Sequence, residues 1–271
     1  MPELPEVETT RRGLEPALAG QRVSHAVVRN RAMRVPVPRT LERAVAGARI
    51  HGVERRAKYL MIVCDRGTLI IHLGMSGRLR LVDRRAAPGT HDHFDLVLEN
   101  GAVVRLRDPR RFGLVLWQEA GTPTHRLLAD LGPEPFDPAF SGAYLYDETR
   151  KRSAAIKQVI MDSHVVVGVG NIYASEALFR AGINPRLPAQ RIGRERCERL
   201  VEHIRATLQD AIRAGGSTLR DYVGSDGEAG YFQNEHLVYG RGGEPCRRCG
   251  AAVRELRQGQ RSTFYCARCQ R

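Results

Sequence analysis

The sequence contains no long apolar run: none of its 271 residues belongs to a stretch approaching the roughly 18 consecutive apolar residues of a membrane-spanning helix. The first residues lack the basic and then apolar segments of a secretory signal. Internal repeats and low-complexity tracts are absent as well. These absences favour a globular protein of the cytosol that is not bound to a membrane.

Lysine is scarce, because only Lys58, Lys151 and Lys157 are lysines among 43 Lys and Arg residues. Such a bias is typical of a GC-rich genome. Arginine does not give up its proton, whereas a lysine amine can serve as an acid, a base or a compact phosphate anchor. The three lysines are therefore candidates for roles that arginine cannot fill.

The charge of the chain is strongly positive, with a formal net charge of +13 and a pI near 10.1. This charge favours an anionic partner, most often nucleic acid. Binding to a ribosome or to a membrane surface stays open on charge alone. The length allows two domains, each with its own core.

The first part of the chain predicts one helix followed by short strands. Residues 5–19 have helical spacing of apolar residues and end before Gly20. Asn100-Gly101 predicts a type I′ hairpin turn. From about Arg22 to Gln118, repeated short β-rich runs separated by turns favour a β-sandwich. The expected strands are 22–28, 59–64, 68–73, 78–82, 94–99, 102–107 and 114–117.

Three prolines between Gly132 and Pro138 mark a domain boundary, because proline disfavours both helix and sheet. Beyond it we expect helices at 153–162, 171–181 and 195–214, the last with one apolar face. Residues 215–243 are rich in glycine and predict a functional loop. The expected division is a β-sandwich at 1–132, a linker at 133–150, a helical domain at 151–240 and a ribbon at 241–271.

Four cysteines near the C-terminus, Cys246, Cys249, Cys266 and Cys269, form two C-x2-C pairs. This spacing predicts one structural zinc ion with four sulfur ligands, and a cytosolic location argues against disulfides. The ribbon carries eight arginines and two acids, so it is suited to phosphates. Arg261 is expected near the tip of its hairpin. Cys64 and Cys197 are expected in the core.

Two turns and one helix start have residues suited to DNA. Asn171 follows a glycine-rich turn and is expected to cap a helix at an anion site, although a cap without a ligand is equally consistent. Met75, Arg110 and Phe112 lie in turns, and such side chains can fill the space left by an extruded base. Ordinary packing is the alternative for each of them.

Pro2 follows the initiator methionine, and removal of Met1 would leave a secondary amine next to Glu3. An α-amino group has an unperturbed pKa near 8, so part of it is uncharged and nucleophilic at neutral pH. Its attack on a sugar aldehyde carbon would give an iminium cation. The alternative is that Pro2 and Pro5 only open a helix.

Six motifs in order resemble the bacterial formamidopyrimidine-DNA glycosylase family over essentially the whole chain. They are PELPEVE (2–8), RRAKYL (55–60), HLGMSG (72–77), DPRRFG (108–113), GVGNIY (168–173) and the four-cysteine ribbon. The resemblance implies an α+β protein with an N-terminal β-sandwich, a helix-two-turn-helix domain and a zinc ribbon. It also implies a monomer that binds damaged double-stranded DNA and one structural zinc ion.

The resemblance further implies the chemistry of each site. Pro2 matches the nucleophile that attacks C1′ of an oxidised purine nucleotide, and Glu3 matches the general acid and base. Lys58 matches the catalytic lysine, and Arg261 matches the ribbon arginine assigned to δ-elimination. The implied DNA contacts are His72, His91, Arg152, Lys157 and Asn171, with Met75, Arg110 and Phe112 as the void-filling residues. Residues 217–239 correspond to a lesion-capping loop.

Two alternatives remain. The endonuclease VIII branch shares the fold, Pro2, Glu3 and Lys58 but prefers oxidised pyrimidines, and Leu4 with the void-filling residues favours the purine branch. The second alternative is a non-catalytic DNA-binding protein that attaches through its ribbon. The intact set of Pro2, Glu3, Lys58 and Arg261 disfavours this alternative, because binding alone needs no free N-terminal proline.

Overall fold

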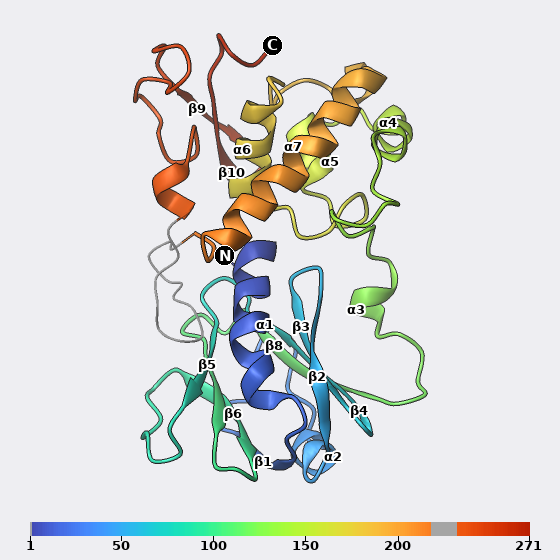
Figure 1. Cartoon of the computed structure of the whole chain (residues 1–271), viewed down its shortest axis with the longest axis vertical. Coiled ribbons are helices and arrows are strands. Elements are labelled where there is room, and N and C mark those ends of the chain that lie inside the picture. The colour runs from blue at the N-terminus through green and yellow to red at the C-terminus, as the bar shows by residue number, and fades with distance from the viewer. Residues whose placement is uncertain (1, 218–231) are drawn as a thin grey trace. The chain divides into compact units, whose positions relative to one another are not determined.

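The structure, a computed structural model, describes residues 2–217 and 232–271, apart from the side chains of 233 and 234. The described residues form two compact units, one of residues 2–129 with 214–217 and one of residues 130–213 with 232–271. The path of the chain through the elements of each unit can be followed in Figure 1. No helix among these residues has the length and apolar character needed to cross a membrane.

The first unit is a β-sandwich with a helix at its N-terminal end. One antiparallel sheet has the order β1-β6-β7-β5 and the other has the order β2-β3-β4-β8. Side chains from both sheets and from α1 share one apolar core, so the predicted sandwich is confirmed. Its elements are α1 (Leu4–Leu18), β1 (Val23–Val28), α2 (Leu41–Val45), β2 (Ile50–Arg56), β3 (Tyr59–Cys64), β4 (Gly67–His72), β5 (Arg78–Val82), β6 (Asp92–Leu98), β7 (Val103–Arg107), β8 (Leu114–Glu119) and α3 (Arg126–Ala129).

Strand β2 is the one strand of the sandwich that the sequence analysis missed. Its buried residues Ile50 and Val53 are three positions apart, which does not fit the alternation of a regular strand. A register shift between Ile50 and Gly52 in the pairing with β3 explains this spacing. The bulge brings both apolar side chains to the core and hides the strand from a period-two pattern.

The predicted type I′ turn at Asn100-Gly101 is wrong, although a hairpin does form there. Type I′ needs a positive φ at both central residues, whereas only Gly101 has one, at 89°. The Leu98 amide donates to the carbonyl of Ala102 at 2.9 Å, and the Gly101 amide donates back to Leu98 at 3.0 Å. This is a three-residue loop that ends in a glycine with left-handed backbone.

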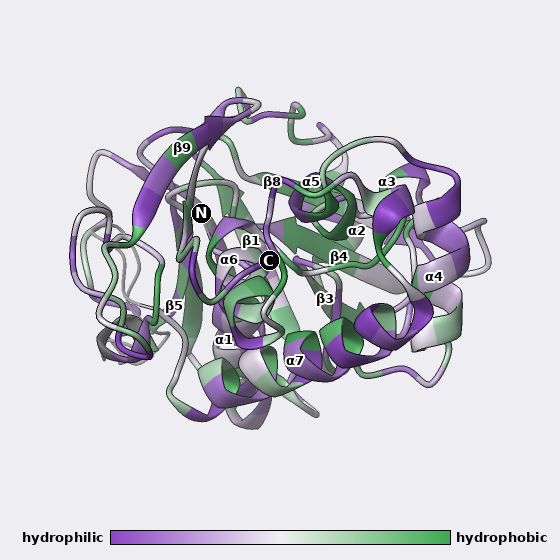
Figure 2. Cartoon of the chain, turned by 90° about the horizontal axis from the view of Figure 1, so that it is seen from above, coloured by the Kyte–Doolittle hydropathy of each residue, from purple (hydrophilic) through white to green (hydrophobic). Residues whose placement is uncertain are grey.

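The second unit is helical and ends in a two-stranded ribbon. Helices α4 and α6 pack against α7, whose buried residues Leu200, Ile204 and Leu208 lie on the predicted apolar face. Figure 2 shows the alternation of hydrophobic and hydrophilic residues along α7. The elements are α4 (Gly142–Arg150), α5 (Ile156–Ile160), α6 (Asn171–Arg180), η1 (Ala189–Arg191), α7 (Arg194–Arg213), η2 (Phe232–Glu235), β9 (Arg254–Gln258) and β10 (Arg261–Tyr265).

Helix α4 occupies residues 142–150, where the sequence analysis expects a linker. Its N-terminus is capped by Ser141, whose hydroxyl accepts a hydrogen bond from the Tyr144 amide at 3.1 Å. The segment is thus part of the helical packing. Cys64 and Cys197 are buried, as expected.

The ribbon is tied to α6 by a buried carboxylate. Glu176, which is fully buried, accepts hydrogen bonds from the amides of Leu237, Val238 and Tyr239 at 2.9, 3.0 and 2.8 Å. Three successive backbone amides thus converge on one carboxyl group. The chain entering the ribbon is therefore fixed to the middle of α6.

Candidate functional site

The N-terminal residues lie at the start of α1. Glu3 is the residue that caps the helix and Glu6 completes a capping box, with the Glu3 amide donating to the Glu6 carboxylate at 2.8 Å. Pro2 is buried, and only 2% of Glu3 is exposed. The capping box thus holds the Glu3 backbone at the positive end of the helix dipole, where carboxylates are favoured.

Glu6 makes a second contact that the sequence analysis did not foresee. The Ser217 amide donates to its other carboxylate oxygen at 2.8 Å. Ser217 begins the segment that the resemblance assigns to a capping loop. Residues 218–231 of that loop lie outside the described residues. Glu6 therefore joins the start of α1 to the residue at which the assigned loop begins.

Lys58 lies in the tight turn between β2 and β3, next to Ala57. Ala57 has a φ of 55°, which is unusual for a residue other than glycine and marks local strain. The Arg55 guanidinium donates to the Ala57 carbonyl at 2.9 Å and pairs with Glu8 of α1 at 3.3 Å. The turn is thereby tied to α1, the helix that carries Glu3.

Glu8 is held in its charged form. Burial alone would raise its pKa, but hydrogen bonds from Arg11 and Arg12 outweigh burial and bring the pKa below its usual value. The ion pairs with Arg11 and Arg55 are therefore present at neutral pH. Because Arg55 also bonds to the Lys58 turn, a charged Glu8 helps to keep that turn against α1.

His72 is a neutral imidazole in this structure. Burial, followed by the nearby charges of Arg34 and Lys58, lowers its pKa to about 4. Its Nδ1 accepts a hydrogen bond from the Gly74 amide at 2.9 Å, so the proton of the ring is on Nε2. The structure thus brings Lys58 close to a histidine that can offer one N–H donor.

The residues that the resemblance assigns to void filling form two exposed tips. Met75 and Phe112 have 39% and 44% of their surface exposed, which is high for large apolar side chains. The Arg110 guanidinium lies over the Phe112 ring, 4.9 Å from its centroid. Arg111 between them has a φ of 56°. The strained turn therefore presents Arg110 and Phe112 as one stacked pair.

His91 and Arg152 are placed less distinctively. His91 is half-buried just before β6, with its ring 6.4 Å from that of His93. Arg152 is half-buried and pairs with Glu148 one helical turn earlier. A phosphate contact by Arg152 would have to compete with this carboxylate.

In the second unit, Lys157, Asn171 and Arg261 line a single cavity of about 260 Å³, together with residues of α5 and of the ribbon turn. Lys157 is only 2% exposed. Its ammonium donates to Asn171 Oδ1 at 2.7 Å, to Thr263 Oγ1 at 2.7 Å and to the Ser262 carbonyl at 3.1 Å. These three acceptors are neutral, and the Asp162 carboxyl group is also among the residues that line the cavity.

The predicted capping role of Asn171 is wrong. Gly170 is the capping residue, and Asn171 is the first residue of α6. Its amide side chain is used elsewhere, because it accepts from Lys157 and donates through Nδ2 to the Ser262 carbonyl at 3.0 Å. Asn171 therefore faces the ribbon beside the cavity.

Arg261 begins β10 opposite Gln258, so its predicted place at the hairpin tip is confirmed.

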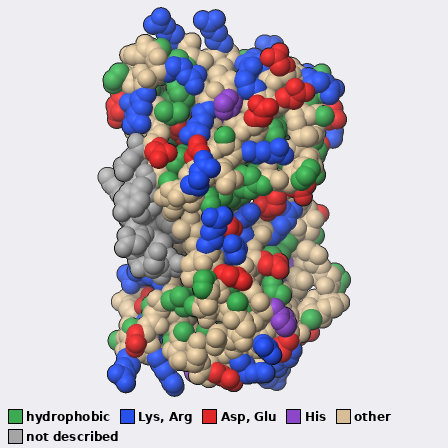
Figure 3. Space-filling model, in the orientation of Figure 1, with side chains coloured by type: hydrophobic (Ala, Val, Ile, Leu, Met, Phe, Trp, Pro, Cys, Tyr) green, Lys and Arg blue, Asp and Glu red, His purple; other side chains and the backbone are tan. Residues whose placement is uncertain are grey.

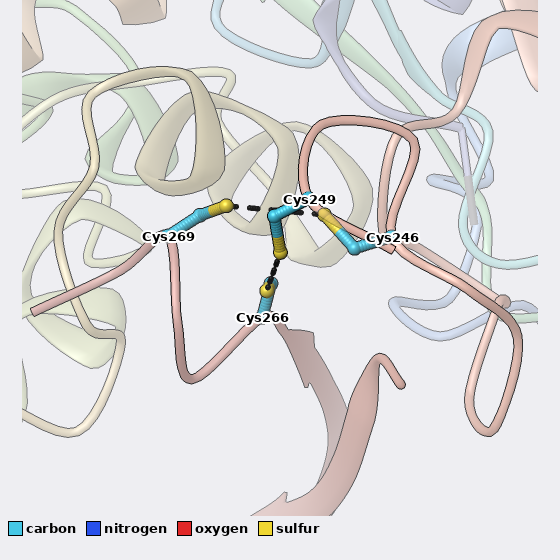
Figure 4. Close-up of side chains that lie close together, drawn as sticks. All are labelled: Cys246, Cys249, Cys266 and Cys269. Atoms are coloured by element: carbon cyan, nitrogen blue, oxygen red, sulfur yellow. Dashed lines mark hydrogen bonds between the residues drawn. The ribbon is translucent and has the colours of Figure 1, made fainter. Parts of the chain in front are cut away.

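The four cysteines of the ribbon converge on one point (Figure 4). Cys246 and Cys269 have their sulfurs 4.0 Å apart, and Cys249 and Cys266 have theirs 3.5 Å apart. These distances exceed the S–S bond of about 2.05 Å. They are close to the separation of about 3.8 Å expected for sulfurs 2.3 Å from a tetrahedral zinc. The donor set therefore fits one closed structural zinc site.

Basic side chains are frequent on the face of the molecule shown in Figure 3. The four converging thiolates of the ribbon define a protein of the zinc-finger class. Three family profiles match it in order: the formamidopyrimidine-DNA glycosylase N-terminal domain at residues 1–115, the H2TH domain of the same enzymes at 131–223, and a zinc finger found in FPG and IleRS at 243–271.

Relatives and solved structures agree with these profiles. The formamidopyrimidine-DNA glycosylase of Stutzerimonas stutzeri (strain A1501) is 59% identical over 271 residues and covers both chains fully. That of Methylobacillus flagellatus is 57% identical, covering 100% of this chain and 96% of the relative. The crystal structure of the MutM (Fpg) protein from Thermus thermophilus has a TM-score of 0.89 at 39% identity, covering 99% and 98% of the two chains.

A further solved structure, of Lactococcus lactis Fpg in complex with DNA that contains an abasic site, has a TM-score of 0.90 at 33% identity and covers 99% of each chain. The chain belongs to the formamidopyrimidine-DNA glycosylase family. It is accordingly a DNA-binding glycosylase of DNA repair with a zinc finger, and the predicted family and fold class are confirmed.

Sequence reasoning missed three buried carboxylates that organise the site: Glu6, Asp108 and Glu176. Glu6 and Glu176 accept hydrogen bonds from backbone amides of another segment, whereas Asp108 accepts from the Gly113 amide of its own loop and from the Ser76 hydroxyl of another loop. Glu6 and Asp108 lie inside motifs that the sequence analysis used, but a carboxylate that bonds to backbone has no partner residue that the sequence would reveal. Only their position next to functional residues was available as a signal.

Proposed function

We propose that the protein is a bifunctional DNA glycosylase and apurinic/apyrimidinic lyase that excises oxidised purines, namely 8-oxoguanine and formamidopyrimidines. The observation that carries this proposal is the buried Pro2-Glu3 pair at the capped start of α1, in a chain that matches the glycosylase family along its whole length. A binding protein has no need of a proline in that position.

In the first step, the Pro2 amine, freed by removal of Met1, attacks C1′ of the damaged nucleotide. The bond between C1′ and the base breaks, and the base leaves with a proton while the sugar ring opens to an iminium cation. Glu3, held at the helix start, is placed to donate and accept protons near the sugar. Burial of Glu3 at the helix N-terminus supports this role.

The iminium then makes the C2′ protons acidic, because it withdraws electrons from that carbon. Loss of a C2′ proton breaks the bond to the 3′ phosphate, and a second elimination releases the 5′ phosphate. We assign Lys58 to the first steps and Arg261 to the second elimination. Hydrolysis of the iminium returns the Pro2 amine, and the DNA keeps a one-nucleotide gap with phosphates at both ends.

The proposed DNA contacts divide between the two units. His72 and His91 in the first unit, and Arg152, Lys157 and Asn171 in the second, bind phosphates, with Lys157 supplying charge beneath the cavity. Met75, Arg110 and Phe112 fill the space of the extruded base, which their exposure supports. Zinc holds the ribbon through its four cysteines and takes no part in the chemistry, since four sulfur ligands leave no open position.

The proposal extends to the setting of the protein. It acts as a monomer in the bacterial cytoplasm, associated with the nucleoid. The proposed domain division is the one expected from the sequence, except that residues 142–150 belong to the helical domain as α4. The alternative function is that of an endonuclease VIII-like glycosylase, which removes oxidised pyrimidines. The exposed set of Met75, Arg110 and Phe112 favours purine substrates.

Borohydride trapping tests the proposal. Protein with confirmed loss of Met1 is incubated with duplex DNA that contains 8-oxoguanine opposite cytosine, and reduction should link residue 2 covalently to DNA. Pro2→Gly should impair excision far more than DNA binding. Lys151→Ala, which removes an exposed amine, is the control and should trap as well as the parent protein. An adduct on any other residue, or no adduct, contradicts the proposal.

A further inference from the structure

Two loops connect the sheets of the sandwich in opposite directions. Residues 73–77 run from β4 to β5, and residues 108–113 run from β7 to β8. Both pairs of flanking strands are themselves hydrogen-bonded partners, β4 with β8 and β5 with β7. The two loops therefore leave the sheets side by side. The first presents Met75, and the second presents Arg110 and Phe112.

A single carboxylate joins these loops. Asp108 is fully buried, and one of its oxygens accepts a hydrogen bond from the Ser76 hydroxyl at 2.9 Å. Its other oxygen accepts from the Gly113 amide at 2.7 Å. The first contact reaches across to the neighbouring loop, and the second closes the loop that Asp108 begins. Both loops are thus bonded to the same side chain.

Glycine backbones allow the loops to approach this closely. Gly74 has a φ of 62°, and a Cβ there would lie 2.4 Å from the Gly113 nitrogen and 2.4 Å from the Phe112 carbonyl carbon. A Cβ on Gly113 would lie 2.8 Å from the His72 carbonyl oxygen. The backbones therefore touch without intervening side chains, so a shift of one loop must displace the other.

We infer that Asp108 is a positioning residue that couples the two loops, so that Met75 and the Arg110-Phe112 pair enter the DNA helix as one rigid unit. The inference rests on the proposed function, because it assigns these tips to the space of the extruded base. Asp108 itself touches no reacting atom. It acts by fixing the distance between the two tips before DNA arrives, which reduces the ordering that binding requires.

Hydrogen exchange of the DNA-free protein tests the coupling directly. Ser76→Ala removes one hydroxyl from the first loop, and it should raise amide exchange at least about tenfold in residues 108–113 of the second loop. Ser24→Ala removes an exposed hydroxyl on β1 and should leave both loops unchanged. A change confined to residues 73–77 would overturn the inference, whether or not the protein cuts DNA.

Excision kinetics provide the second test. Under single-turnover conditions on 8-oxoguanine duplex DNA, Ser76→Ala and Asp108→Asn should each slow excision about tenfold, as loss of one buried hydrogen bond to a carboxylate predicts. The variant with both substitutions should be no slower than Asp108→Asn, because each substitution breaks the same link between the two loops. Losses that multiply to about a hundredfold would contradict the coupling.

Epistasis separates positioning from general damage to the fold. In a Met75→Ala and Phe112→Ala background, Asp108→Asn should cause no further loss of excision, because the tips it positions are gone. A further tenfold loss there would assign Asp108 a purely structural role. If the parent protein excises no base, the proposed function fails, while the exchange experiment still decides the coupling.

Discussion

Replacement of Lys157 by methionine should destabilise the second unit. The side chain is buried, and its ammonium makes three hydrogen bonds that join α5 to α6 and to β10. Methionine keeps the length of the side chain but cannot donate. The change therefore removes the link between the helices and the ribbon without leaving a large cavity.

The magnitude follows from the three acceptors. Thr263 is fully buried, so its hydroxyl cannot exchange the lost bond for water, which costs about 1 to 3 kcal/mol. Asn171 and Ser262 can be hydrated in part and add less. Relief of the buried charge offsets some of this loss. We expect a net loss of about 2 to 4 kcal/mol, which corresponds to a decrease in Tm on the order of 5 to 10 °C.

Lys151→Met is the matched control, since Lys151 lies in the same unit with 65% of its side chain exposed and pairs with Glu148 at the surface. Such pairs contribute at most about 1 kcal/mol. Calorimetry should show a large decrease for Lys157→Met and little change for Lys151→Met, and hydrogen exchange should rise in β10. Equal effects of the two substitutions would refute the reasoning.

Three further predictions concern His72, the zinc site and Gly74. Because the pKa of His72 is lowered to about 4, the unfolded chain binds a proton at this residue before the folded protein does as the pH falls. The stability that His72 contributes is therefore complete above pH 6.5 and is lost as the pH falls toward 4. NMR of the ring should show Nε2–H at pH 6, and a measured pKa above 6 would contradict this prediction. Removal of zinc by a chelator should unfold the ribbon and abolish DNA binding, and zinc-free protein that binds normally would refute the structural assignment. Gly74→Ala should lower the free energy of unfolding by about 1 to 3 kcal/mol, because the new Cβ clashes with the facing backbone at a position with positive φ. Gly101→Ala, where φ is also positive but nothing lies within 4 Å of the new Cβ, should lower it less. The opposite order would argue against the clash.

Much of the fold was predictable because it depends on local patterns. Short β-rich runs separated by turns predicted all strands of the sandwich except β2, and the apolar face of α7 marked its buried side correctly. The four cysteines predicted a metal site because zinc imposes its own geometry on their spacing. In each case, the signal and the structure lie within the same few residues.

The site was less predictable, because its geometry depends on contacts between distant segments. Asn171 is a residue type that often caps helices, and it lies next to the start of α6. Its side chain instead bonds to Lys157 and to the Ser262 carbonyl, which lies 91 positions away in the sequence. The Asn100-Gly101 pair predicts a tight turn, but the pairing of β6 and β7 sets a three-residue loop instead. Tertiary contacts override local preference in both places.

The buried acids show why the position of a residue in the sequence does not predict its hydrogen-bond partner. Glu6, Asp108 and Glu176 face backbone amides, although the chain offers 43 basic side chains that could pair with them. An amide donor is present at every residue except proline, so the sequence cannot reveal which amide a carboxylate will meet. Pairing with arginine would orient a mobile side chain, whereas bonding to amides fixes the path of the backbone itself. A chain that must place a proline amine, two exposed tips and a ribbon therefore uses its buried acids where rigid backbone is needed.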